Sequence, residues 1–118
     1  MSEPRYQLRY FFDSGSGVCL WSSNAAARER FGYAVEADQL GLSTKLCRQH
    51  AHMCAWFDTS VDWDDPAGPS PWTLEEAERF DDASTSMLRD LRQELGSEFA
   101  IADERRTADS DAAAWTAT

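Results

Sequence analysis

The sequence predicts a two-layer α+β domain, in which about three helices cover one face of a small antiparallel sheet. Two observations carry this prediction. Aromatic segments with strand-like alternation lie towards both ends of the sequence. Between them, two long segments repeat apolar residues at helical spacing. The expected element order is β-β-α-α-α-β, and 118 residues suit one domain with one modest core.

A β-hairpin is expected first. Residues 7–13 (QLRYFFD) alternate as a strand, and residues 18–22 (VCLWS) read as the return strand. The SGSG segment at 14–17 supplies the turn, because glycine accepts a positive φ. The side chains expected on the buried face of the first strand are Leu8, Tyr10 and Phe12.

Two helices should follow the hairpin. Asn24 is a typical N-cap for a short helix ending at Phe31. Residues 33–42 are expected to form a connecting loop, after which Ser43 caps a second helix running to about Phe57. The apolar stripe of this second helix is expected to contain Leu46, Cys47, His50, Met53, Cys54 and Phe57.

The third helix carries the clearest start signal. Thr73-Leu-Glu-Glu76 is a capping box, and Trp72 stands where a hydrophobic staple would place it. The helix should run to Leu95, with the following glycine as its stop. Its inner face is expected to contain Leu74, Ala77, Phe80, Ser84, Met87, Leu88, Leu91 and Leu95.

A last strand is expected at residues 98–103 (EFAIAD), joining the sheet of the hairpin. Residues 1–103 would then form the single domain. Residues 104–118 are small, polar and rich in alanine, so we expect them to be a disordered tail.

An acidic segment at residues 58–82 dominates the charge of the chain. It holds nine acidic residues and one arginine, a net charge of −8 against −10 for the whole sequence. Such a field disfavours nucleic acid and anionic membranes and attracts basic partners. The alternative is that the acidity only keeps the protein soluble.

The expected location is the cytoplasm. The first residues lack the basic start and apolar run of a signal peptide, and no apolar run approaches the roughly 18 residues that span a bilayer. Three cysteines, an odd number, fit reduced thiols.

A cluster of thiol and imidazole side chains offers an alternative function, a small zinc-binding or thiol-redox protein. Cys47, His50 and Cys54 share a helix face, and Cys19 could add a third thiolate. Close paired cysteines are missing, however, and small thiols often line a core. We therefore expect no cofactor and no metal.

Enzymatic activity is not expected. Asp62 to Asp65 do not fit a calcium-binding loop, because Trp63 and Pro66 interrupt the ligand spacing. No glycine-rich phosphate loop occurs, no Ser/His/Asp spacing stands out, and a domain of this size leaves little room for a sugar cleft.

Several motifs together resemble a family of small, acidic, uncharacterised bacterial proteins. They are the CLW of the second strand, the FGY at residues 31–33, residues 40–43, the DWDDP and PSPW motifs, and ELG before the last strand. The resemblance covers residues 6–103, implies a single folded unit and brings no known activity. Proteins of this size and acidity are similar in kind to immunity proteins of bacterial toxin systems.

The predicted function is therefore a non-enzymatic protein-interaction module, such as an immunity protein or inhibitor, that binds a basic protein through the loop at residues 60–71. Three prolines make this loop rigid, and tryptophan is frequent at interface hot spots. Glu75 and Glu76 also serve the start of the third helix, so the aspartates are the stronger candidates. The predicted partner-binding residues are Asp62, Trp63, Asp64, Asp65, Trp72, Glu75 and Glu78.

Overall fold

The computed structural model describes residues 3–106. Within that range the chain forms four strands, three α-helices and two short 3-10 helices. In chain order they are β1 (Tyr6–Tyr10), β2 (Leu20–Ser22), α1 (Ala25–Phe31), β3 (Ala34–Val35), η1 (Ala37–Leu40), α2 (Thr44–Asp58), α3 (Leu74–Leu95), η2 (Gly96–Glu98) and β4 (Phe99–Asp103).

The α+β class is confirmed, and the sheet differs from the prediction in two ways. Its order is β3-β2-β1-β4, and β1 pairs antiparallel with β2 as expected. β4, however, pairs parallel with β1, so the sheet is mixed rather than antiparallel. The predicted loop at residues 33–42 also contains β3, which pairs antiparallel with β2.

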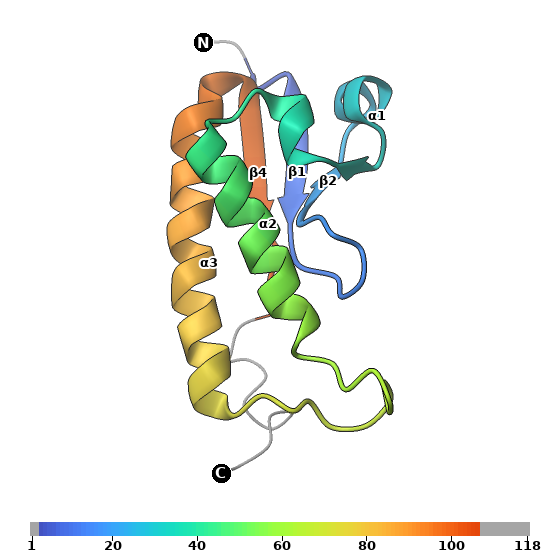
Figure 1. Ribbon diagram of the computed structural model, residues 1–118. Coiled ribbons are helices and arrows are strands. Elements are labelled where there is room, and N and C mark those ends of the chain that lie inside the picture. Colours follow the sequence, from blue (N-terminus) through green and yellow to red (C-terminus); the bar gives the residue numbers. More distant parts are fainter. Residues whose placement is uncertain (1–2, 107–118) are drawn as a thin grey trace.

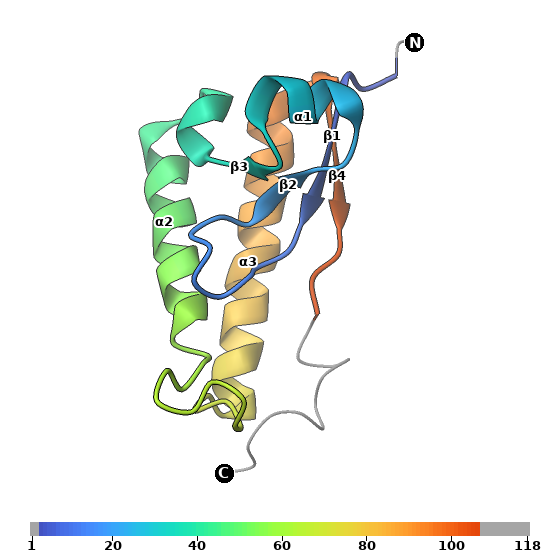
Figure 2. The ribbon, with the colours of Figure 1, turned by 90° about the vertical axis from the view of Figure 1, so that its right-hand side faces the viewer.

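The helices form the second layer. α2 and α3 run antiparallel and cover one face of the sheet, while α1 closes the end at which β1 begins (Figures 1 and 2). Alternation in β1 decides which side chains face them: Tyr6, Leu8 and Tyr10 are buried, whereas Gln7 is exposed. This is the period-2 pattern of a strand covered on one side.

Local signals explain the helix boundaries. Asn24, Ser43 and Thr73 each accept a hydrogen bond from a backbone N–H of the first turn, as predicted. The reciprocal half of the predicted capping box is absent from α3. The Glu76 carboxylate instead accepts from the indole of Trp56 at 3.1 Å and pairs with an arginine one turn further on.

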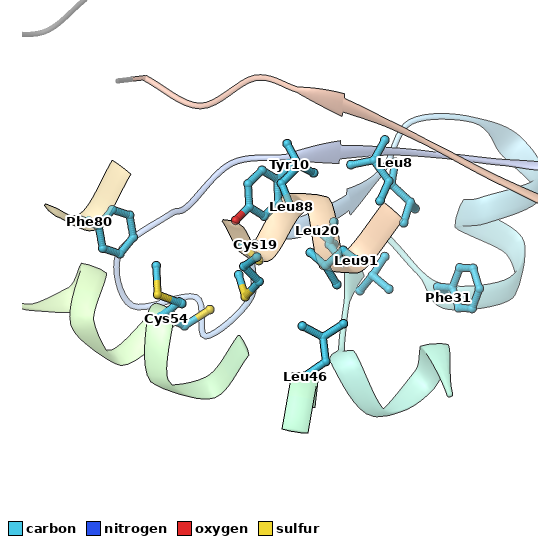
Figure 3. Close-up of a cluster of buried hydrophobic side chains, with 14 of the residues drawn as sticks. Leu8, Tyr10, Cys19, Leu20, Phe31, Leu46, Cys54, Phe80, Leu88 and Leu91 are labelled. Carbon is cyan, nitrogen blue, oxygen red and sulfur yellow. The ribbon is translucent and has the colours of Figure 1, made fainter. Parts of the chain in front are cut away.

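The core lies between the sheet and the two long helices. Figure 3 shows Leu8 and Tyr10 of β1 above Leu88 and Leu91 of α3. A second, aromatic part of the core fills the end towards the α2–α3 connection. There Phe80 contacts the rings of Phe12, Phe57, Trp56 and Trp72, with centroids 4.9–5.6 Å apart.

The first residues of the predicted tail, Glu104 and Arg105, contact the rest of the fold. The backbone N–H of Glu104 donates to the Tyr10 carbonyl at 3.0 Å, and its carboxylate pairs with Arg9 at 2.8 Å. Arg105 donates to the Ser84 hydroxyl at 2.6 Å. The rest of the predicted tail, residues 107–118, lies outside the described residues.

Candidate functional site

The connection between α2 and α3, residues 59–73, presents the predicted surface at one end of the molecule (Figure 1). Backbone hydrogen bonds give it a defined course: Asp65 N–H donates to the Asp62 carbonyl and Gly68 N–H to the Asp65 carbonyl, both at 2.9 Å. The Asp62 side chain also accepts from the backbone N–H of Asp64 at 3.0 Å. Asp62, Asp64 and Asp65 are therefore exposed side chains on a backbone that consecutive turns hold in place.

Trp63 is the most exposed large apolar residue among residues 3–106, with 57% of its surface accessible. Its indole N–H nevertheless donates to the Asp58 carbonyl at 3.0 Å. The Asp58 carboxylate in turn accepts from the backbone N–H of Gly15 at 2.9 Å. Gly15 has φ +83°, and a Cβ there would lie 3.5 Å from the Trp63 ring. The hairpin loop thus supports one side of Trp63 while its other side faces solvent.

Trp72, another predicted partner-binding residue, lies inside the fold. It is 5% exposed, and its indole N–H donates to the Thr59 hydroxyl at 2.8 Å. Its ring packs against Phe80 with centroids 5.2 Å apart. Burial of the indole fits the predicted staple position better than direct contact with a partner.

The glutamates of α3 divide into two kinds. Arg79 bonds Glu75 at 2.9 Å and Glu76 at 2.5 Å, so both carboxylates have an intramolecular cation. Arg79 and Trp56 together hold the pKa of Glu76 below its usual value. Glu78 is exposed. Within residues 3–106, no ion pair involves Glu78, Asp62, Asp64 or Asp65.

An apolar hollow of about 250 Å³ lies beside this end of the molecule. Its lining includes five aromatic side chains and one guanidinium: Phe11, Phe12, Phe57, Trp72, Phe80 and Arg105. No local sequence pattern indicates the hollow, because its walls come from four separate segments. The only sequence signal is the run of aromatic residues at 10–12, which by itself predicts a strand.

The thiol cluster forms in part. Cys19, His50 and Cys54 are buried, and their sulfur and nitrogen atoms all lie within 4.8 Å of one another. Cys47 is not part of the group; its sulfur contacts the Leu42 carbonyl at 3.8 Å. Hydrogen bonds from Cys19 and His50 lower the pKa of Cys54, while burial raises the pKa of Cys19.

Asp58 and Gly15 are functional candidates that sequence reasoning did not select. They are 43 residues apart, and their hydrogen bond ties the hairpin loop to the acidic connection. Nothing local in the sequence indicates this contact. The helix-terminal position of Asp58 and the glycine pair of the turn were visible, but not their proximity.

Comparison with known proteins places the sequence in a family. No curated protein matches the sequence. The model of a family described as Serratia CdiI immunity protein-like matches residues 7–102. That match covers β1 through nearly all of β4, and so includes the acidic connection and the buried thiols. The chain therefore belongs to the Serratia CdiI immunity protein-like family.

Proposed function

We propose that this protein is a non-enzymatic immunity protein that binds a basic protein toxin in the cytoplasm and thereby neutralises it. Family membership supports the immunity function. Two observations support the acidic connection as the binding surface. Trp63 is exposed there, and the three neighbouring aspartates form no ion pair within residues 3–106. A helix able to cross a membrane is absent from residues 3–106.

Charge supports a basic partner. No lysine or arginine occurs between Arg48 and Arg79, whereas Asp58 to Asp65 supply four carboxylates. An exposed field of one sign speeds the encounter with an oppositely charged protein. Aspartates without an intramolecular cation also break no existing ion pair when they bind a partner's Lys or Arg side chains.

Pre-organisation supports Trp63 as the anchor. Its indole hydrogen bond to Asp58 and its contact with the hairpin loop fix the ring before any partner arrives. Pro66, Pro69 and Pro71 further restrict the connection. Less entropy is then lost on docking, and the indole contributes a large rigid apolar surface. In this proposal Glu75 and Glu78 form the rim, and Trp72 supports the loop from inside.

The test requires a candidate toxin, a basic protein sought among the products of the genes that adjoin the gene of this protein. Co-expression of the two should restore growth, and the purified proteins should bind each other. The triple exchange Asp62→Lys, Asp64→Lys and Asp65→Lys should weaken binding by about 100-fold or more, mainly by slowing association. Trp63→Ala should weaken it by about 30-fold, the cost of a typical hot spot, mainly by speeding dissociation.

A matched control separates the surface from the net charge. Glu29→Lys, Asp38→Lys and Glu98→Lys change three exposed acids on other parts of the molecule. Because each exchange adds two positive charges, both triple variants have the same formal charge. Equal weakening by the two triples would contradict the proposed surface. Failure of the unaltered protein to bind or to rescue growth would contradict the immunity function itself.

A further inference from the structure

A buried group of two thiols and one imidazole lies between the hairpin and α2, apart from the proposed toxin surface. Cys19 precedes β2, whereas His50 and Cys54 lie on α2. The three residues are 0%, 4% and 7% exposed. Figure 3 shows Cys19 reaching from the hairpin towards Cys54, and the ligand atoms of all three residues lie within 4.8 Å of one another.

Helical spacing sets up two of the three donors. His50 and Cys54 are four residues apart and so share one face of α2. The Nε2 of His50 lies 3.9 Å from the Sγ of Cys54. A tetrahedral zinc ion with a Zn–S bond of about 2.3 Å and a Zn–N bond of about 2.05 Å separates such donors by about 3.6 Å. A movement of a few tenths of an ångström would therefore bring this pair to zinc geometry, and the Cys19 sulfur lies within 4.8 Å of both donors.

The chemistry of the donors selects the class of metal. Two thiolates and one imidazole are soft and borderline ligands, which favour zinc over calcium or magnesium. Three protein ligands leave the fourth position for water or another exogenous donor. Both thiols lose their protons on binding, so affinity should rise with pH.

The His50 ring has few hydrogen-bond partners. In the part of the chain that the structure describes, its ring makes one polar contact, the long one to Cys54. A buried imidazole whose nitrogens lack partners costs free energy, and metal coordination removes that cost for one of them. Cys47, which sequence spacing grouped with these residues, points its sulfur to the Leu42 carbonyl instead.

We propose that Cys19, His50 and Cys54 bind one zinc ion, which joins the hairpin to α2. The ion would be a second link between the hairpin and α2, in addition to the Asp58–Gly15 hydrogen bond. Zinc would then stabilise the folded protein, because the unfolded chain does not hold these donors together. Zinc binding does not involve the toxin, so it can be tested independently of the immunity function.

The test is a zinc titration of the whole protein after it has been unfolded with a chelator and refolded in a metal-free reducing buffer. A competing chromophoric chelator should report one zinc per chain with a Kd on the order of 10⁻⁷ M or tighter. The melting temperature should rise with zinc. Co²⁺ in place of zinc should give the absorption of a tetrahedral thiolate site.

Cysteine variants provide matched controls. Cys54→Ser and Cys19→Ser should lose about 100-fold or more in zinc affinity, because even outer partners of a metal site contribute about 10- to 100-fold. Cys47→Ser should bind zinc like the unaltered protein. The proposal is overturned if the unaltered protein binds zinc no more tightly than about 10⁻⁵ M, or if Cys47→Ser loses as much affinity as Cys54→Ser. The first outcome remains decisive even if a variant fails to fold.

Discussion

Arg105, which follows β4, is held against α3 by several hydrogen bonds. It donates to the hydroxyls of Ser84 and Thr85 on α3, at 2.6 and 2.9 Å, and pairs with Asp103 at 2.7 Å. Its side chain is only 7% exposed. Ser84 is itself buried, and its carbonyl accepts from the Tyr10 hydroxyl at 2.8 Å. The guanidinium therefore links β4 and α3 through a site that also holds β1.

We predict that Arg105→Ala lowers the free energy of unfolding by about 2 kcal/mol, since several charge-assisted hydrogen bonds are lost from a buried site. Arg89→Ala is the control, because Arg89 is an exposed residue of α3 whose bond to Ser86 is long, at 3.3 Å. Urea denaturation followed by tryptophan fluorescence measures both. Equal effects of the two variants would show that the Arg105 contacts are not stabilising.

The same ion pair predicts a pH dependence. Hydrogen bonding from Arg105 holds the pKa of Asp103 below its usual value. The pair therefore stabilises fully above the unfolded pKa of about 3.9 and loses its effect as the pH falls through the lower folded pKa. The stability difference between the unaltered protein and Arg105→Ala should accordingly narrow below about pH 4. A difference that stays constant from pH 7 to pH 3 would contradict this.

At the scale of elements, α2 begins by contacting the end of α3. The Ser43 hydroxyl accepts from the Leu46 N–H and donates to the Glu94 carboxylate at 2.7 Å. Glu94 also accepts from the Ser43 N–H at 2.8 Å, and these bonds lower its pKa. The helix cap is therefore shared between two helices that are far apart in sequence.

A double-mutant cycle tests this shared cap. Ser43→Ala should cost about 1 kcal/mol, the usual cost of losing an N-cap. Glu94→Gln combined with Ser43→Ala should cost less than the sum of the two single variants, because the residues act through one contact. Glu98→Gln, an exposed residue of η2, should add to Ser43→Ala without coupling. Strict additivity of both pairs, measured by chemical denaturation, would show that Ser43 and Glu94 act independently.

The elements predicted from the sequence were those with local causes. Caps at Asn24, Ser43 and Thr73 and the apolar stripes of α2 and α3 each depend on residues within a few positions. β3 was missed because two residues show no periodicity. Its position follows from Gly32, whose φ of +81° turns the chain back along β2.

In the candidate site, too, the features with local causes could be predicted and those that depend on distant contacts could not. Exposure of Asp62, Asp64 and Asp65 follows from composition and the nearby prolines, whereas the burial of Trp72 depends on aromatic partners from α2 and α3. His50 and Cys54 could be placed together by helical spacing. The proximity of Cys19 to them depends on how the hairpin lies on α2, which no local pattern specifies.

At the scale of the whole molecule, β1 is a central strand and its two neighbours come from opposite parts of the sequence. β2 follows after a short loop, but β4 arrives only after both long helices. The direction of β4 could not be predicted because it depends on how the chain returns from α3. The result is a sheet whose centre depends on long-range pairing.

We predict that a chain ending at Glu98 does not fold, because β1 loses its parallel partner over five residues and the core loses Ile101. A chain ending at Arg106 should retain a cooperative thermal transition, since it keeps all described elements. Far-ultraviolet circular dichroism during heating distinguishes the two. A cooperative transition in the shorter chain would show that β4 is dispensable.

The parallel pairing of β1 with β4 also sets the point in synthesis at which the sheet can be completed. A ribosome makes β1 before both long helices and β4 only after them, so the sheet stays incomplete until residues 99–103 have been synthesised. While α3 is being synthesised, the acidic connection is already present but the sheet still lacks β4. If the protein neutralises a toxin, each molecule offers protection only after its synthesis has passed β4, and a newly exposed cell depends on copies completed beforehand.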